Sequence, residues 1–367
     1  MERIMKKRIL GLICIGVLAG GLLAGCGSSD ETASSGTEEA TSESASEESS
    51  VDTSNAEYTL NVQTHDPESS ATGDFLNAWA ETVEEESEGR IDIQIYFGGT
   101  LGTATDTLDL LRNGTCDIGW GLQSFYADTF PVTEVFQLPM IDISSAEQGS
   151  YALWNFYNNY DYMTAEYEDF HVLVLHANCQ SPISTRDEKL ESIEDLQGMQ
   201  IRAMSGPPTT FVQNLGASPF SCSLQDLYSN LEKGVVDGCI TDFHGIKSFK
   251  LDEVIGYMLD ANIGISTYFL MMNQDSYDAL PEDLQTIIDE ASADAIQYTS
   301  AWDIVEEEQR EAYADMLYTW DDEEMAKLQE VADQTIDEWI ESMTEAGYDG
   351  QAIYDDAMAE IEAAAVE

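Results

Sequence analysis

Apolar residues recur along this chain at two different periods, and the two periods alternate. Residues 91–97 carry apolar side chains at every second position, which is typical of a half-buried strand. Residues 224–233 carry them at the i, i+3, i+4 and i+7 spacing of one helix face, through Leu224, Leu227, Tyr228 and Leu231. The alternation holds from 58 to 121 and again from 199 to 238. It predicts an α/β fold that contains parallel strands.

The second of these stretches places several polar residues where strands end. The apolar run 199–204 predicts a short strand that carries one charged residue, Arg202. A proline pair then predicts a helix over 207–214, and the next strand is expected at 235–238. Ligands of such sheets bind beyond the carboxyl ends of the strands. We therefore expect four residues to converge on one cleft: Arg202, Thr241, Asp242 and His244.

Three passages resemble the substrate-binding proteins of tripartite ATP-independent periplasmic (TRAP) transporters, in that family's order. They are GRIDIQIYFGGTLGTATDTLDLLRNGTCDIG (89–119), FPVTEVFQLPMI (130–141) and the stretch 196–238, which contains LQGMQIRAM, LGASP and LYSNLEKGVVDG. The resemblance implies a two-lobed, periplasmic-binding-protein-like α/β fold. It has two mixed sheets flanked by helices, a ligand cleft between the lobes, and a long helix, here 282–316, that spans both.

The same resemblance suggests how the chain divides between the lobes. We expect lobe I to comprise 57–183 and 265–308. Lobe II is then expected to comprise 184–264 and 309–365.

The N-terminal residues predict export and a lipid anchor. A basic start and the apolar run 9–23 precede Ala24-Gly25-Cys26, and the run is too short to span a bilayer. We interpret 1–25 as a lipoprotein signal peptide and Cys26 as the lipidated residue; an ordinary secretory signal is the alternative. Residues 26–56, rich in Ser and Glu, predict a disordered tether. The protein is thus expected on the outer face of the cytoplasmic membrane, held only by its N-terminal lipid.

Charge and missing motifs exclude several functions. The formal net charge of -57 at pH 7 argues against a nucleic-acid partner. There is no GxSxG, HExxH, phosphate loop or dinucleotide fingerprint, so we predict no enzyme and no cofactor. Without a CxxC or a Cys/His ligand spacing, no metal site is predicted. The pairing of Cys116, Cys179, Cys222 and Cys239 stays open. We expect a monomer.

Arg202 is the strongest binding candidate because it lies in an apolar strand. A buried guanidinium without a partner costs several kcal/mol, so an anion should meet it. That anion is either an acid of the chain or a ligand carboxylate held by two hydrogen bonds. The resemblance implies the second, with the arginine that matches Arg186 assisting. The alternative for Arg186 is a surface position beside Asp187 and Glu188.

Other candidates are less specific. The family's asparagine after the VDG passage is absent here, and Thr241 or Asp242 could replace it. His65, at a strand end, and His244 could contact the ligand or simply be solvated. The first lobe is expected to contribute Gln123, Phe125 and Tyr126 to the cleft wall. Tyr268 is a weaker candidate, because an aromatic residue in a return strand usually packs.

Together these features predict a tethered receptor that delivers a small organic acid to a TRAP permease. The resemblance makes four-carbon dicarboxylates the default ligand, and sugar acids, keto acids and aromatic acids stay open. A surface sensor for a signalling partner and an exported enzyme are the alternatives.

Overall fold

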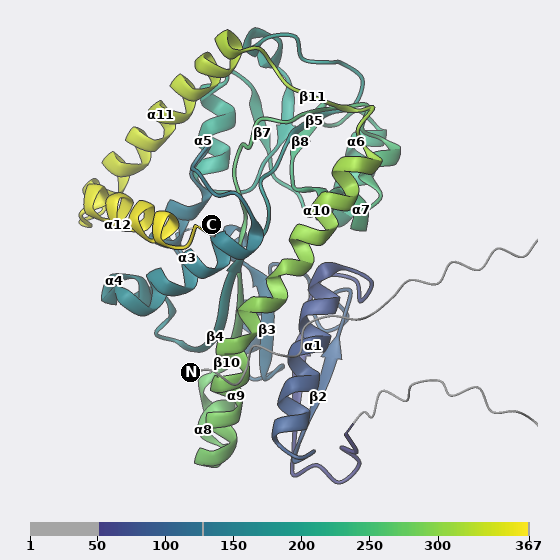
Figure 1. Cartoon of the computed structure of the whole chain (residues 1–367), viewed down its shortest axis with the longest axis vertical. Helices are drawn as coiled ribbons and strands as arrows, with labels where there is room; N and C mark the ends of the chain where they lie inside the picture. The colour runs from purple at the N-terminus through teal and green to yellow at the C-terminus, as the bar shows by residue number, and fades with distance from the viewer. Residues whose placement is uncertain (1–50, 127, 366–367) are drawn as a thin grey trace, which may run out of the picture. The chain divides into compact units, whose positions relative to one another are not determined.

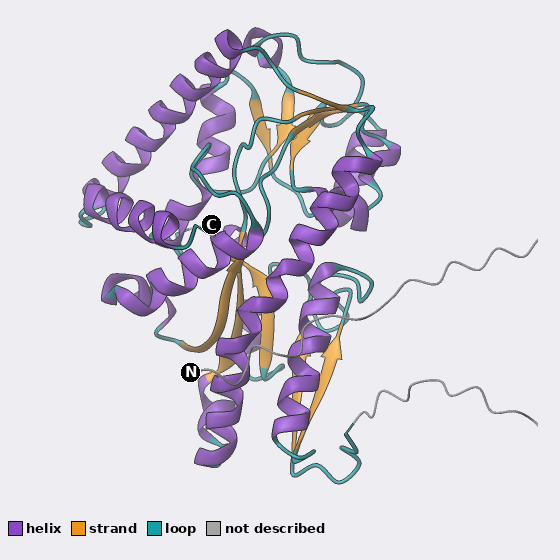
Figure 2. Ribbon diagram, in the orientation of Figure 1, coloured by secondary structure: helices purple, strands orange, loops and turns teal. Residues whose placement is uncertain are grey.

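The computed structural model describes residues 51–126 and 128–365, which belong to one compact unit (Figure 1). The predicted signal peptide 1–25, Cys26 and most of the predicted tether 26–56 lie outside the described residues. Helices and strands alternate along the described chain, as the pattern of apolar residues predicts (Figure 2).

The first sheet has five strands in the order β2-β1-β3-β10-β4. The strand bounds are β1 Tyr58–Gln63, β2 Ile91–Tyr96, β3 Ile118–Leu122, β4 Phe170–Ala177 and β10 Thr267–Asn273. Strand β1 runs parallel to β2 and β3, whereas β10 runs antiparallel to β3 and β4. The sheet is therefore mixed, and its antiparallel strand is the one that returns from the second sheet.

The second sheet has six short strands in the order β11-β9-β5-β8-β6-β7. Their bounds are β5 Ile183–Thr185, β6 Gln200–Arg202, β7 Ser218–Phe220, β8 Gly238–Ile240, β9 Tyr257–Leu259 and β11 Leu317–Tyr318. Strand β6 is parallel to β7 and β8, and β5 is antiparallel to β8 and β9. Strand β8 begins three residues later than predicted, because Gly234 to Asp237 form the turn after the preceding helix.

Helices flank both sheets. Their bounds are α1 Ala71–Glu86, α2 Thr107–Arg112, α3 Ala146–Asn159, α4 Asp161–Thr164, α5 Pro207–Asn214, α6 Leu224–Glu232, α7 Phe243–Ser248, α8 Gln274–Asp278, α9 Glu282–Asp294, α10 Ser300–Ala312, α11 Asp322–Glu345 and α12 Gly350–Ala363. Local signals explain several starts. The Ser70 and Ser223 side chains accept backbone N–H groups at the beginnings of α1 and α6, and Pro207 opens α5.

The predicted helix 282–316 is present but interrupted. A 3₁₀ segment, Ala295–Thr299, separates α9 from α10, and the helix ends at Ala312. The segment still joins elements of both sheets, because α9 packs on α1 and α10 packs on α3 and α7 (Figure 1). Arg310 of α10 forms two hydrogen bonds to the Asp260 carboxylate, at 2.6 and 3.1 Å, which tie the helix to the second sheet.

The C-terminal helices divide differently from the predicted lobe boundaries. Helix α11 packs on α5 beside the second sheet, but α12 packs on α3, and Ile353, Ala357 and Ile361 enter a core shared with β4 and β10. The prediction had assigned all of 309–365 to lobe II. A helix belongs to the lobe against which its apolar face is buried. The sequence shows that α12 has an apolar face but not which lobe covers it.

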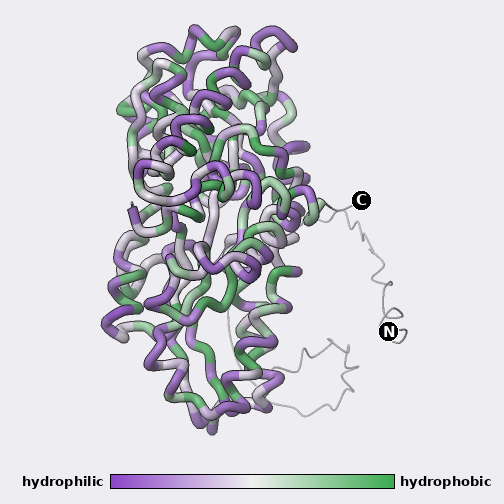
Figure 3. The backbone as a smooth tube through the Cα atoms, turned by 90° about the vertical axis from the view of Figure 1, so that its left-hand side faces the viewer, coloured by the Kyte–Doolittle hydropathy of each residue, from purple (hydrophilic) through white to green (hydrophobic). Residues whose placement is uncertain are grey.

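Hydrophobic residues are spread through the whole described chain rather than gathered in one band (Figure 3). None of the helices in the described part is both long enough and apolar enough to cross a membrane.

Candidate functional site

A cavity lies where strands of both sheets end. The cavity is narrow in this structure, with a volume of about 20 Å³. Its lining comprises His65, Asp66, Leu122, Phe125, Arg202, Met204, Leu224, Thr241, Asp242, His244, Phe249, Ser266 and Tyr268. His65 and Asp66 follow β1, Arg202 ends β6, and Thr241 follows β8. Within each sheet the carboxyl ends of parallel strands point to one edge, and these edges of the two sheets meet at the cavity.

Arg202 contributes a buried guanidinium to this cavity. Its side chain donates from Nε to the Cys222 carbonyl (3.2 Å), from Nη1 to the Ile240 carbonyl (3.3 Å) and from Nη2 to the Met204 sulfur (2.8 Å). Only 3% of Arg202 is exposed. Within residues 51–126 and 128–365, no Asp or Glu side chain forms an ion pair with it. Burial lowers the pKa of Arg202, but a guanidinium stays protonated in proteins.

Asp242 places a carboxylate in the same cavity. It caps α7, because its Oδ1 accepts the Gly245 N–H at 3.0 Å. Its Oδ2 is buried and has no hydrogen-bond partner among the described residues. Burial raises the pKa of Asp242, and nearby His244 opposes that rise.

His65 and Asp66 form a second polar pair. The His65 Nε2 lies 3.5 Å from an Asp66 oxygen, and the other Asp66 oxygen accepts the Thr72 hydroxyl at 2.6 Å. The His65 Nδ1 is buried without a partner among the described residues. Burial lowers the pKa of His65, which favours the neutral ring, and Asp66 partly offsets this effect.

Two hydrogen bonds join lining residues of the cavity to neighbouring helices. The Ala71 N–H, at the start of α1, donates to Nε2 of His244 at 3.1 Å. The Gln225 side chain, on α6, donates to the His65 carbonyl at 3.1 Å. Elements that flank different sheets are thus joined directly. Such bonds between lobes are expected of a binding protein that closes around a ligand.

A family comparison identifies the class of protein to which this chain belongs. Residues 62–351 match the family described as "Bacterial extracellular solute-binding protein, family 7". The chain belongs to this family.

Similar proteins and structures support this family assignment and show which type of solute-binding protein the chain resembles. The Ectoine-binding periplasmic protein TeaA of Halomonas elongata is 26% identical over 303 residues, which cover 79% of this chain and 86% of that protein. The C4-dicarboxylate-binding protein DctB of Bacillus subtilis is 24% identical over 284 residues, covering 75% and 77%. A TRAP solute-binding protein of Rhodoferax ferrireducens T118, in complex with copurified benzoate, has a TM-score of 0.78 at 27% identity, covering 83% and 98%. This solute-binding protein is therefore of the TRAP type.

Six of the nine predicted binding residues line the cavity of this solute-binding protein: His65, Phe125, Arg202, Thr241, Asp242 and His244. Sequence reasoning missed Asp66, although a carboxylate directly after a strand was a usable signal. Tyr268 was a weaker candidate, because an aromatic residue in a return strand usually packs. It stacks on Trp120 with ring centroids 4.8 Å apart, but it also lines the cavity.

Arg186 does not reach this cavity. Its side chain pairs with Asp187 at 2.6 Å and donates to the Leu231 carbonyl at 3.3 Å. Strand β5 runs antiparallel to β8, so the residue after β5 lies beside the start of β8, at the opposite edge of the sheet. The position of Arg186 therefore agrees better with a surface residue beside Asp187 than with a residue that assists Arg202 in binding the ligand.

Gln123 and Tyr126 also point away from the cavity. The Gln123 amide donates to the Tyr167 hydroxyl at 3.1 Å, and the Tyr126 hydroxyl donates to the Ala104 carbonyl at 2.9 Å. Residues 123–125 form a 3₁₀ turn instead of continuing β3. Such a turn rotates successive side chains by about 120°. Of the three predicted first-lobe residues, Gln123, Phe125 and Tyr126, only Phe125 therefore faces the cavity.

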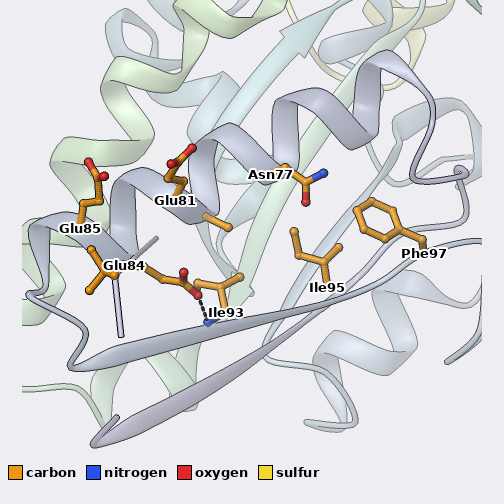
Figure 4. Close-up of a pocket in the computed structure, with 9 residues that line it drawn as sticks. Asn77, Glu81, Glu84, Glu85, Ile93, Ile95 and Phe97 are labelled. Carbon is orange, nitrogen blue, oxygen red and sulfur yellow. Dashed lines mark hydrogen bonds between the residues drawn. The ribbon is translucent and has the colours of Figure 1, made fainter. Parts of the chain in front are cut away.

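A second, more open pocket lies between α1 and β2 (Figure 4). Ile93, Ile95 and Phe97 form one wall, and Glu81, Glu84 and Glu85 come from the helix above. The Glu84 carboxylate accepts the Ile93 N–H at 2.9 Å, which satisfies a donor of the edge strand β2. No Lys or Arg lines this pocket among the described residues, so it does not suit an organic anion.

The four described cysteines are unpaired in this structure. Cys179 lies near Asp303 and Glu306, a grouping of the kind that can hold a metal. The Asp303 oxygens, however, accept the backbone N–H groups of Ala146 and Glu147 at 2.7 and 3.1 Å. Asp303 thus holds the first turn of α3, which accounts for its position.

Proposed function

We propose that this protein binds a small organic acid through Arg202 and delivers it to a TRAP permease as a monomeric receptor without enzymatic activity. The observation that carries the proposal is the buried guanidinium without an acidic partner in the described chain. A ligand carboxylate would supply the missing charge. Hydrogen bonds to charged groups are worth about 1.5–3 kcal/mol each, so two of them supply about half of a micromolar affinity.

The relatives support the class of ligand without selecting one acid. Their names include a C4-dicarboxylate and ectoine, and similar structures hold benzoate, 3-hydroxybenzoate and mandelate. His65, Phe125, Thr241, Asp242 and His244 are proposed to complete the binding site around Arg202. The lobe boundaries predicted for 57–308 remain part of the proposal, with α12 moved to lobe I.

We also propose that Cys26 carries the lipid that holds the protein at the outer face of the cytoplasmic membrane. The sequence Leu23-Ala24-Gly25-Cys26 after an apolar run supports this assignment. Metabolic labelling with a palmitate analogue is expected to mark the wild type but not Cys26→Ser. Equal labelling of both proteins would contradict the anchor.

A thermal-shift screen against organic acids tests the binding function. A ligand at one hundred times its Kd stabilises the protein by about 2.7 kcal/mol, which is a readily measured shift. Arg202→Lys should lose most of this shift, because an ammonium group cannot form the paired hydrogen bonds of a guanidinium. Arg112→Lys, at a surface position, is the matched control. A hit that keeps its full affinity in Arg202→Lys would show that Arg202 is structural.

A further inference from the structure

The cavity holds more negative than positive charge. Arg202 is the one Lys or Arg side chain among its described lining residues, whereas both Asp66 and Asp242 line it. His244 is already engaged, because its Nε2 accepts the Ala71 N–H. His65 is buried, and burial favours its neutral form.

Two acceptor atoms in this cavity have no donor. Asp242 Oδ2 and His65 Nδ1 are both buried without a hydrogen-bond partner in the described part of the chain. The Nδ1 atom is an acceptor when the proton of the neutral ring is on Nε2, where the Asp66 oxygen lies 3.5 Å away. A buried acceptor left unpaired costs free energy, so both atoms need a donor when the site is filled.

Neighbouring protein groups do not supply that donor. The Asn178 amide lies close enough to Asp242 to lower the pKa of that carboxyl. One of its two N–H groups donates to the Tyr268 hydroxyl at 3.1 Å and its oxygen accepts the Ser266 N–H at 2.6 Å, but in this structure it forms no hydrogen bond to Asp242 Oδ2. The Gly245 N–H is already taken by Asp242 Oδ1. The free Oδ2 is thus left for the content of the cavity.

We propose that the ligand is a zwitterionic acid, whose carboxylate binds Arg202 and whose protonated nitrogen donates to Asp242 Oδ2, with His65 Nδ1 as a second acceptor. This inference rests on the proposed function and narrows its ligand class. A dicarboxylate fits poorly, since its second carboxylate would meet two buried aspartates and no second cation. A protonated nitrogen fits better than a hydroxyl, because it also offsets the excess negative charge of the site.

Sets of acids matched in shape test this assignment. One set has a five-membered ring: proline offers a cationic donor, pyroglutamate a neutral N–H donor, and cyclopentanecarboxylate no donor. Larger sets pair amino acids with their deaminated analogues, and succinate represents the dicarboxylates. Affinities are measured by calorimetry on the full mature chain. In at least one set the cationic member should bind about tenfold or more tighter than the member without a donor.

Two variants test whether the preference for the cationic acid depends on Asp242. Asp242→Asn keeps an oxygen to cap α7 but removes the charge, and Asp242→Ser also caps a helix while shortening the side chain. Both should reduce the preference for the cationic member to less than about threefold, because the charged acceptor is gone. Asp321→Asn makes the same chemical change at the start of α11, outside the cavity, and should preserve the preference.

The possible outcomes separate this inference from the proposed function. Acids without a donor, or succinate, that bind at least as tightly as the cationic members and depend on Arg202 would overturn the zwitterion assignment alone. Tightest binding by neutral donors would also overturn it. Binding of no acid in any set would overturn both proposals.

Discussion

The backbone N–H of Ala71 donates a 3.1 Å hydrogen bond to Nε2 of His244, a residue 173 positions further along the chain. Ala71 begins α1, beside the first sheet, and His244 lies in α7, beside the second. The bond therefore connects the two lobes at the cavity, and it uses one of the N–H groups that the first turn of a helix leaves without an internal partner. A hydrogen bond that forms only when the lobes are closed couples ligand binding to lobe closure.

Replacing His244 by Phe should weaken ligand binding. The ring volume against Trp302 is retained, but the Ala71 N–H loses its acceptor, and a hydrogen bond contributes about 0.5–1.5 kcal/mol. We expect the Kd to rise about two- to tenfold. Small-angle scattering should show a more open protein at subsaturating ligand. His171→Phe, which affects a histidine paired with Asp289 outside the cavity, is the control. Unchanged affinity and scattering in His244→Phe would remove the bond from the closing mechanism.

Replacing Arg202 by Met should stabilise the ligand-free protein while abolishing binding. An unpaired buried charge carries a desolvation cost that an apolar side chain of similar length avoids. We expect a gain of about 1–3 kcal/mol in the free energy of unfolding. Urea unfolding without ligand measures this gain. A loss of stability would indicate that Arg202 holds the sheet through its bonds to the Cys222 and Ile240 carbonyls.

The same substitution at Arg310 should act in the opposite direction. Arg310 forms two hydrogen bonds to Asp260, pairs with Glu306 at 2.8 Å and lies over the Phe243 ring. Because the group is about one-third exposed, we expect Arg310→Met to cost only about 1–2 kcal/mol. Urea unfolding is again the measurement, and an unchanged midpoint would show that α10 does not depend on this pair.

His176 should make stability fall in acid. It is fully buried, its Nε2 accepts the Trp120 N–H at 2.9 Å, and burial lowers its pKa to about 3. The unfolded chain takes up this proton near pH 6.5, while the folded protein does not until about pH 3. Stability is therefore lost as the pH falls below 6.5, by about 2 kcal/mol between pH 7 and pH 5.

The variant His176→Gln isolates this contribution from that of the many carboxylates. Its oxygen can accept the Trp120 N–H, and it does not titrate. The difference in unfolding free energy between wild type and variant should shift by about 2 kcal/mol against the wild type from pH 7 to pH 5. A constant difference over this range would mean that His176 has the same pKa in the folded and unfolded protein.

Much of the local structure could be predicted from sequence because its causes are local. The proline pair and the following residues predicted a helix over 207–214, and α5 has those bounds. The periodic face of 224–233 became α6, with Leu227 and Leu231 buried. The break of the predicted helix 282–316 at Ala295–Thr299 had no local signal, since neither Gly nor Pro occurs there. That segment packs against α1, α3 and β4, so tertiary contacts set its geometry.

For the site, the sequence by itself determined that an arginine would end a short apolar strand and need an anion, and that Thr241, Asp242 and His244 would follow another strand. These inferences depend only on residue type and strand order. The tertiary structure alone decided which candidates share a cavity. The antiparallel direction of β5 carries Arg186 to the far edge of its sheet, and a 3₁₀ turn rotates Gln123 and Tyr126 away. The tertiary structure also leaves Asp242 Oδ2 without a hydrogen-bond donor among the described residues. Strand direction and hydrogen-bond geometry depend on residues far apart in the chain, and a local pattern contains neither.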